Sequence, residues 1–255
     1  MLLAIDVGNT HTVFGVWDGK TWVAVWRRAT NPDRTEDQIA VWLKGAFDLA
    51  GVLYDVDAVV CGSVVPAANE AIERLAQRWF RIDPLFVQAA NVGVPVDYEP
   101  PSSVGADRLV NALAALAKHQ PPMVVVDLGT ATTFDAISKD GVYVGGAILP
   151  GILVSSQALA SHTAKLPQVE FVAPARTIGR NTAESIQSGL MFGYASAIDG
   201  IVRRIAKELG GKVLTIATGG LGGLFLGLCE TIEVYEPNLT LDGLRLAYDK
   251  VRGRG

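Results

Sequence analysis

Two stretches of the chain share one pattern of apolar and polar positions. Residues 2–5 are apolar and predict a buried strand that ends at Asp6, and residues 123–126 repeat this pattern and end at Asp127. In both places the aspartate opens a D-x-G sequence with a threonine one or two positions after the glycine, and then come two apolar-rich segments joined by Asp-Gly, which is a β-hairpin signal. Close to half of the chain separates the two aspartates. The sequence therefore predicts two similar lobes that face one cleft.

The remaining pattern is typical of α/β lobes. Helical spacing predicts helices over residues 35–49, 66–80, 106–118 and 184–209, and short apolar runs predict strands over 57–65, 85–88 and 214–217. Residues 91–104 contain three prolines and predict a loop. This loop is long enough to suggest a functional role.

Composition narrows the class of protein. The chain has 255 residues with a net charge of −4, and 49% of its residues are apolar, which favours a folded domain over disorder and argues against nucleic acid as the main partner. No apolar run approaches the roughly 20 residues of a membrane span. The first residues lack the basic region of a secretory signal, so we expect a cytoplasmic protein without membrane contact. Two cysteines cannot build a disulfide framework, and the three histidines show no metal-ligand spacing.

The repeated D-x-G sequence, with its nearby threonine, can bind phosphate. Its glycine lets backbone N–H groups approach an anion, its threonine adds a hydroxyl group, and its carboxylate can hold a hydrated Mg²⁺ that bridges phosphates. A single copy is better explained as a tight turn, because turns favour these residues. Two copies, each between a buried strand and a hairpin, indicate a phosphate site.

A glycine-rich segment follows the strand predicted over 214–217. Thr218-Gly219-Gly220 resembles a dinucleotide fingerprint, but Phe225 occupies the position of its last glycine. The bare backbone there could contact a flat ligand such as adenine, or it could allow close packing inside the protein. The sequence leaves both explanations open.

The ordered motifs together resemble the type III pantothenate kinases, which belong to the actin-like ATPase and sugar-kinase superfamily. The resemblance covers essentially the whole chain. It implies an α/β fold of two similar actin-like (ribonuclease H-like) lobes facing an ATP cleft, over residues 1–118 and 119–255. The motifs that carry it are Asp6-Val7-Gly8-Asn9-Thr10, Gly105-Ala106-Asp107-Arg108, Asp127-Leu128-Gly129-Thr130-Ala131-Thr132, Gly145-Gly146-Ala147-Ile148-Leu149-Pro150-Gly151, Asn181-Thr182 and Thr218-Gly219-Gly220.

The resemblance also implies an activity. Its members phosphorylate pantothenate to 4'-phosphopantothenate with ATP, the first step of coenzyme A biosynthesis. They use a divalent cation such as Mg²⁺ and a monovalent cation, K⁺ or NH₄⁺, and they work as homodimers. We therefore expect ATP, both cations and a second copy of the chain as partners.

Residue roles carry over motif by motif. Asp107 matches the catalytic base, Asp6 and Asp127 match cation ligands, with Asp127 holding the monovalent ion, and Thr130 and Gly219 match ATP contacts. The first phosphate loop matches Asp6, Val7, Gly8, Asn9, Thr10, His11, Thr12 and Val13, and the second matches residues 127–133. The positions that match pantothenate contacts are Tyr98, Gly105, Ala106, Asp107, Arg108, His162 and Thr182.

Simpler explanations exist for several of these residues. Asp107 could be an acid in the first turn of a helix, favoured there by the helix dipole after a cap at Ser103. Arg108 could be a solvated helix arginine, although its forked guanidinium group is suited to a substrate carboxylate. His162, between Ser161 and Thr163, is most simply a surface residue. The motif match favours the functional role for Asp107.

The helix predicted over 184–209 has two distinct faces. Gly189, Gly193 and Ala197 repeat at four-residue spacing, which permits close backbone approach. The helix could pack within its own lobe or against a second subunit. Its apolar positions are Ile186, Leu190, Tyr194, Ile198, Ile201, Ile205 and Leu209.

Two rival functions remain. The first is a non-catalytic nucleotide-binding regulator on the same fold, against which the joint presence of Asp6, Asp107, Arg108 and Asp127 argues. The second is a sugar kinase or phosphatase of the superfamily, because a fold does not determine the substrate.

Overall fold

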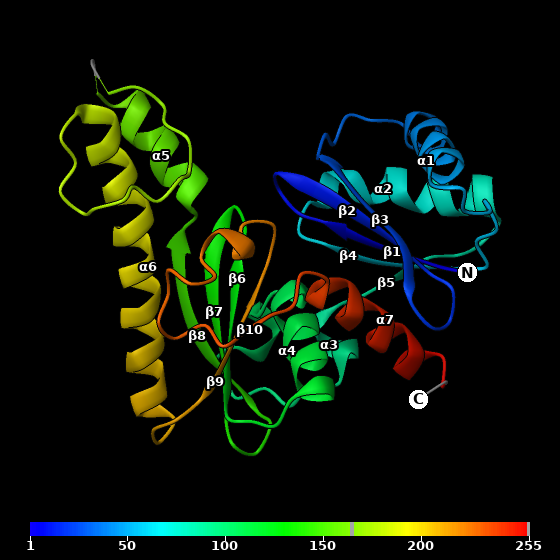
Figure 1. The fold of residues 1–255 in the computed structure, drawn as a ribbon. Coiled ribbons are helices and arrows are strands. Elements are labelled where there is room, and N and C mark those ends of the chain that lie inside the picture. Colours follow the sequence, from blue (N-terminus) through cyan, green and yellow to red (C-terminus); the bar gives the residue numbers. More distant parts are fainter. Residues whose placement is uncertain (164–165, 254–255) are drawn as a thin grey trace. The chain divides into compact units, whose positions relative to one another are not determined.

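The computed structural model describes residues 1–163 and 166–253, which form two compact units (Figure 1). Unit 1 contains residues 1–94, 99–114 and 240–253, and unit 2 contains residues 95–98 and 115–239. The end of the chain thus belongs to the unit in which the chain begins, which differs from a simple division into residues 1–118 and 119–255. No helix in the described part of the chain is long and apolar enough to cross a membrane.

Each unit is built on a mixed five-stranded sheet. The order is β3-β2-β1-β4-β5 in unit 1 and β8-β7-β6-β9-β10 in unit 2. In both sheets the first strand of the unit is antiparallel to the next strand of the chain and parallel to the fourth. The predicted duplication is therefore confirmed. The strands are β1 Leu2–Val7, β2 His11–Trp17, β3 Trp22–Ala29, β4 Ala58–Ser63, β5 Leu85–Phe86, β6 Met123–Leu128, β7 Ala131–Ile137, β8 Tyr143–Pro150, β9 Leu214–Thr218 and β10 Val234–Tyr235.

The helices agree with most of the predicted spans. The predicted helix over 66–80 is α-helical to Leu75 and continues as a π-helical turn over Ala76–Phe80, and the loop over 91–104 holds a 3-10 turn at Pro101–Ser103. Helices α3, α5 and α7 were not predicted: α3 has only four residues, and the apolar residues of α5 do not mark one clear face. The helices are α1 Glu36–Ala50, α2 Pro66–Leu75, α3 Ala89–Val92, α4 Ala106–Lys118, α5 Ile152–Ser161, α6 Thr182–Glu208 and α7 Leu239–Val251.

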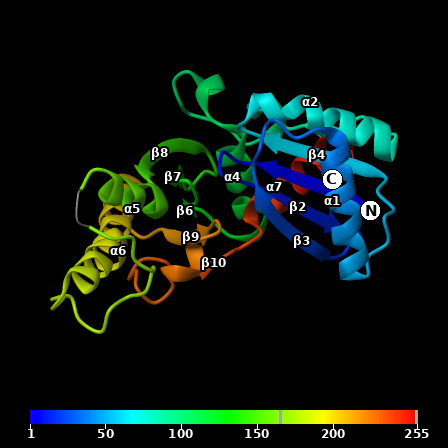
Figure 2. The same cartoon turned by 90° about the horizontal axis from the view of Figure 1, so that it is seen from above.

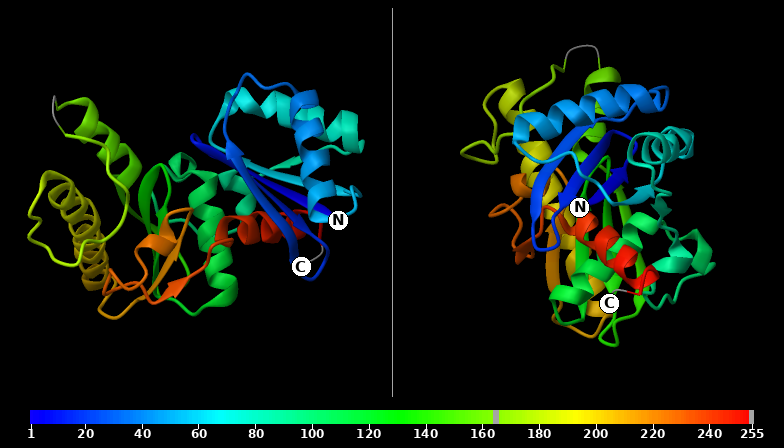
Figure 3. Two further views of the ribbon diagram at one scale, coloured as in Figure 1. Left: turned by 45° about the horizontal axis from the view of Figure 1, so that its top comes forward. Right: turned by 90° about the vertical axis from the view of Figure 1, so that its right-hand side faces the viewer.

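Helices cover both faces of the unit 1 sheet (Figures 2 and 3). On one face, α1 buries Phe47 and α2 buries Ile72 in one cluster with strand residues such as Ile5. On the other face, α7 lies close to strand glycines: a Cβ atom on Gly15 or Gly62 would lie 2.8 Å from a leucine of α7. The glycines therefore allow the C-terminal helix to pack directly on β2 and β4.

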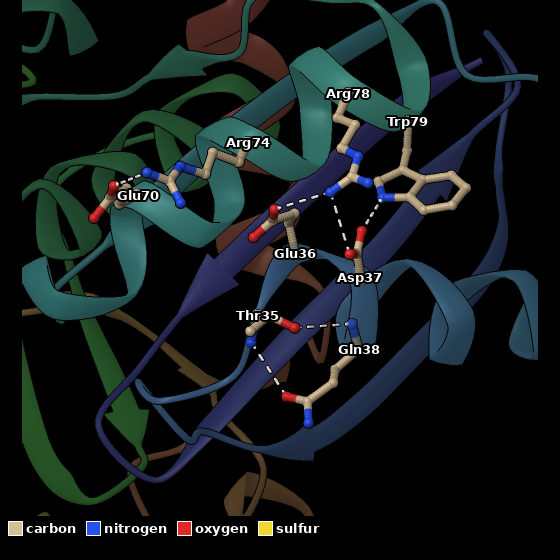
Figure 4. Close-up of polar contacts among 8 residues, drawn as sticks. All are labelled: Thr35, Glu36, Asp37, Gln38, Glu70, Arg74, Arg78 and Trp79. Carbon is tan, nitrogen blue, oxygen red and sulfur yellow. Dashed lines mark hydrogen bonds and ion pairs between the residues drawn. The ribbon is translucent and has the colours of Figure 1, made fainter.

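Polar contacts fix the start of α1 (Figure 4). Thr35 is the N-cap, and its side chain forms a capping box with Gln38. Arg78 pairs with Glu36 and Asp37 at 3.3 and 3.2 Å and ties the π-helical turn to this end of α1. Because Arg78 is exposed, these ion pairs contribute little stability, on the order of 0–1 kcal/mol.

In unit 2, α6 packs against β6 and β7. Val124, Val126 and Leu128 of β6 join Phe134 of β7 and Ile198 of α6 in one buried cluster. Successive strand residues point to opposite faces. Asp127 therefore lies on the sheet face that α6 does not cover.

Candidate active site

Two carboxylates occupy equivalent places at the ends of the central strands. Asp6 lies in β1 between the core residues Ile5 and Val7, so it points away from α1 and α2. Asp127 has the same place in β6 and points away from α6. Both side chains are half-buried and have polar or charged partners. This position follows from the pleat of the strand, because the residues on either side of each aspartate face the core under the helices.

The first loop joins β1 to β2. The Gly8 N–H donates to the His11 carbonyl at 3.0 Å, and the Thr30 hydroxyl donates to the Gly8 carbonyl at 2.7 Å. Thr12 is buried and shares a hydrogen bond with the Thr30 hydroxyl at 2.9 Å. Residues 9–11 are exposed. The tip of the loop is therefore open to a ligand, while its base is held by β3 and the residue after it.

The second loop, between β6 and β7, is one residue shorter. Leu128 pairs with Thr132, whereas in the first loop Val7 pairs with Thr12. As a result the strand residue opposite Asp127 is Thr133, while Val13 lies opposite Asp6. The two loops therefore differ in chemistry, because the cross-strand neighbour of Asp127 carries a hydroxyl group and that of Asp6 is apolar.

The turn after β8 holds the second loop. The Gly151 N–H donates to the Thr130 carbonyl at 2.9 Å. A Cβ atom on Gly151 would collide with the backbone carbonyl groups of Gly129 and Thr130. The Tyr194 hydroxyl, from α6, donates to the Thr132 hydroxyl oxygen at 2.6 Å. The shape of the loop thus requires a glycine at position 151, while Thr130 remains exposed at its tip.

Gly219 lies against Asp127. Its φ angle is +86°, which favours glycine, and a Cβ atom there would collide with Oδ1 of Asp127 and lie 2.7 Å from the backbone of Leu128. Close packing between the ends of β9 and β6 is therefore sufficient to explain this glycine. A contact between Gly219 and a nucleotide remains a prediction.

Asp107 lies in the first turn of α4. A Cβ atom on Gly105 would collide with its Oδ1 atom, so the carboxylate occupies the space that this glycine leaves. The hydroxyl of Ser103 donates to the Pro100 carbonyl at 2.8 Å within the 3-10 turn. Because α4 begins at Ala106, its N-cap position is Gly105 and not Ser103. Asp107 and Arg108 are both half-buried.

The other predicted substrate positions belong to unit 2. Tyr98 is 38% exposed and packs edge-on against Tyr143, with ring centres 6.3 Å apart. His162 is exposed at the end of α5, and Thr182 is the first residue of α6, directly after the N-cap Asn181. Thr182 lines a groove of about 610 Å³. The apolar side chains of this groove are Leu159, Leu166, Ile186 and Leu190.

Tyr98 and the groove lie at opposite ends of β8. Tyr98 packs beside Tyr143 and Gly145 at the start of this strand, and α5 follows its last residue. Five residues of strand span about 17 Å. Within unit 2, Tyr98 therefore does not reach the groove that contains Thr182.

The glycine face of α6 is open in the single chain. Gly189 and Gly193 are exposed, and no heavy atom among the described residues lies within 4 Å of the place of a Cβ atom on either. The apolar face instead packs inside unit 2, through Ile198 among others. The apolar face of α6 is thus buried within the chain, and its glycine face is exposed.

The two cysteines do not supply a nucleophile. Burial raises the pKa of the Cys61 thiol and raises that of Cys229 to about 12, so neither is a nucleophile near neutral pH. Among the described residues, no three acidic, histidine or cysteine side chains form a metal-binding group. A divalent cation held by one carboxylate together with phosphates and water, as Mg²⁺ commonly is, fits Asp6 better than a site built from protein ligands alone.

Sequence reasoning missed Asp135, Tyr143 and the steric role of Gly151. Asp135 is a charged residue inside an otherwise apolar predicted strand. A buried carboxylate needs hydrogen-bond donors. An aspartate inside an apolar strand was therefore the signal that could have identified Asp135. Tyr143 carried no such signal, because a strand tyrosine is ordinary.

Comparison with known proteins identifies relatives over the full length. A family model described as type III pantothenate kinase matches residues 2–204. A type III pantothenate kinase from Anaeromyxobacter sp. (strain Fw109-5) is 47% identical over 254 residues, which are 99% of this chain and 100% of the relative.

Solved structures share the fold at low identity. Component A of (R)-2-hydroxyglutaryl-CoA dehydratase from Acidaminococcus fermentans has a TM-score of 0.56 at 17% identity and covers 100% of this chain and 99% of its own. MreB 5 of Spiroplasma citri has a TM-score of 0.54 at 12% identity, with coverage of 99% and 97%. These likenesses confirm the predicted fold of two actin-like lobes.

Proposed function

Because the chain belongs to the type III pantothenate kinase family, we propose that it transfers the γ-phosphate of ATP to the primary hydroxyl group of pantothenate. The product is 4'-phosphopantothenate, and the reaction begins coenzyme A biosynthesis. The observation that carries the proposal is the full-length match to relatives with this activity in their name. The two loops that begin with D-x-G and contain a threonine, at the ends of β1 and β6, support phosphate binding.

The test is an assay of ADP release with purified protein and a panel of hydroxyl-bearing substrates. We expect ADP release that depends on pantothenate, with the phosphorylated product detected by mass spectrometry. Nucleotide binding without turnover on any substrate would instead identify a regulator. Turnover on a sugar but not on pantothenate would identify a sugar kinase.

Asp107 is the proposed base. Phosphoryl transfer passes through a loose transition state that needs positioning and charge neutralisation more than a strong base. An ordinary carboxylate can therefore accept the hydroxyl proton at one of its Oδ atoms, while the substrate oxygen bonds to the γ-phosphorus and the bond to ADP breaks. Arg108 follows Asp107 in α4, and its forked guanidinium group is suited to the pantothenate carboxylate. Gly105 and Ala106 are proposed to complete this end of the substrate site.

The two loops and their aspartates are proposed to hold the nucleotide. The exposed tip of the first loop and Thr130 of the second would contact phosphates. Asp6 fits a Mg²⁺ ion that would neutralise phosphate charge when bound. Asp127 is the proposed ligand of a monovalent cation, K⁺ or NH₄⁺. Its half-buried carboxylate beside Gly219 and opposite Thr133 offers the oxygen atoms that such an ion requires.

The cation role of Asp127 predicts a salt response. Activity should rise when K⁺ replaces Na⁺ at constant ionic strength, and K⁺ should raise the melting temperature, because ligands that bind only the folded state stabilise it. Asp127→Ala should lose both responses. Asp140→Ala, at an exposed acid of the same unit, is the matched control and should keep them. Equal rates and equal melting temperatures in the two salts would reject the assignment.

We further propose that the chain works as a homodimer. The open glycine face of α6 supports this, and so do the exposed apolar side chains Val172 and Ile178 in the segment before it, which are 56% and 80% exposed. A C₂ dimer would bring the same helix to both sides of the contact. A partner could then supply the groove that Tyr98 does not reach in its own chain, with Thr182 and His162 at its edge.

A further inference from the structure

Asp135 is a fully buried carboxylate in the middle of β7. Its exposed fraction is 0%, and its neighbours Phe134, Ala136 and Ile137 are buried apolar residues. A charge in such a place is costly unless donors surround it. Two hydroxyl groups donate to it: that of Thr133 to Oδ2 and that of Tyr143 to Oδ1, each at 3.1 Å. One carboxylate therefore joins two side chains from neighbouring strands.

The hydrogen bond from Thr133 connects Asp135 to the second phosphate loop. Thr133 closes that loop and lies directly opposite Asp127 in the β6–β7 pairing. Since its hydroxyl proton is directed to Asp135, the hydroxyl oxygen offers its lone pairs, and not a proton, to anything bound beside Asp127. Asp135 thus determines both the rotamer and the hydrogen-bonding sense of Thr133.

The hydrogen bond from Tyr143 connects Asp135 to the segment that contains Tyr98. The Tyr143 N–H donates to the Pro95 carbonyl at 2.9 Å, and the Asp97 N–H donates to the Tyr143 carbonyl at 2.8 Å. The Tyr98 ring packs against the Tyr143 ring, and a Cβ atom on Gly145 would lie only 3.2 Å from it. Tyr143 and Gly145 therefore form the seat of Tyr98, and Asp135 fixes the ring that makes this seat.

We propose that Asp135 is a positioning residue of the kinase. It holds the seat of Tyr98, on the pantothenate side, and Thr133, on the phosphate side, in one fixed arrangement. The inference rests on the proposed function for its kinetic consequences. The hydrogen bonds themselves are independent of that function.

Asp199 provides a matched comparison within the same unit. It is also buried, at 5% exposure, and accepts hydrogen bonds from the Glu230 N–H at 3.0 Å and from the Thr231 N–H and hydroxyl at 2.9 and 2.6 Å. These partners lie in the loop before β10 and include no proposed substrate position. Loss of its charge should therefore lower stability and leave substrate binding unchanged.

The kinetic test separates the contributions of the two hydrogen bonds to Asp135. Tyr143→Phe removes the Oδ1 donor and should raise the KM for pantothenate by about tenfold, roughly the loss of one hydrogen bond to a charged group, with the KM for ATP unchanged. Thr133→Val removes the Oδ2 donor and should raise the KM for ATP or lower kcat by a similar factor, with the KM for pantothenate unchanged. Thr133→Ser, which keeps the hydroxyl, should restore the wild-type values.

Asp135→Asn should combine both effects, whereas Asp199→Asn should show neither at a comparable loss of melting temperature. If both asparagine variants keep wild-type KM and kcat values, Asp135 is only structural and the inference is overturned. If Asp135→Asn does not fold, Tyr143→Phe and Thr133→Val decide the question, and unchanged kinetics in both would likewise overturn it.

Hydrogen exchange supplies a readout that does not need activity. In Asp135→Asn the amides of Asp97 and Tyr143 should exchange faster than in the wild type, whereas Asp199→Asn should affect those of Glu230 and Thr231. Unchanged exchange at Asp97 and Tyr143 would overturn the inference. A wild-type protein without pantothenate-dependent ADP release would reject the proposed function instead, and the exchange result would still report on the seat of Tyr98.

Discussion

Replacement of Asp107 by asparagine is expected to lower kcat by about 100-fold or more, the usual contribution of a positioned base. The substitution keeps the shape of the side chain and its place over Gly105 but removes the proton acceptor. Folding should be intact, because Asp107 is half-buried in the first turn of α4 and no packing volume changes. Steady-state kinetics and a thermal melt measure the two quantities. Near-normal kcat would remove Asp107 from the catalytic role.

Gly105→Ala tests the same assignment and leaves residue 107 an aspartate. The new Cβ atom would collide with Oδ1 of Asp107, which is the free end of a side chain and can move. Stability should therefore change little, while displacement of the base by about 1 Å should cost up to about 100-fold in kcat. An active Gly105→Ala protein would show that the carboxylate need not remain in this place.

Gly193→Leu is expected to separate the subunits and to raise the KM for pantothenate by about tenfold, roughly the loss of one hydrogen-bonded contact. The KM for ATP should change less, because no atom of the second phosphate loop lies within 4 Å of the place of a Cβ atom on Gly193. In the single chain the substitution meets open space. It should even favour the helix by up to about 1 kcal/mol, because glycine is a poor helix former. Any loss of association therefore arises from the contact between subunits.

The matched control is Gly45→Leu. Gly45 is also an exposed helical glycine with no heavy atom of the described chain within 4 Å of the place of a Cβ atom, but it lies in α1 of unit 1. Sedimentation of this variant should match the wild type, and its kinetics should be unchanged. A folded monomer of Gly193→Leu with an unchanged KM for pantothenate would show that the pantothenate site lies within one chain.

The sequence alone determined the doubled architecture and the places of the two aspartates. Both follow from local pattern: an apolar run predicts a buried strand, and a residue at its end has a known face once the alternation is known. The start of α4 at Ala106 and the acid in its first turn were predictable for the same reason. Consecutive residues are also neighbours in the folded chain, so Asp107 and Arg108 could be named from the sequence alone.

Only the tertiary structure decided which residues support these sites. Asp135 holds Thr133, two residues away, but also Tyr143 on another strand, and Tyr143 in turn seats Tyr98 from a distant loop. Gly151 is required by the carbonyl groups of Gly129 and Thr130, and Gly15 and Gly62 by a helix near the end of the chain. Such requirements arise from close packing between segments far apart in sequence. The local pattern of apolar and polar residues therefore does not contain them.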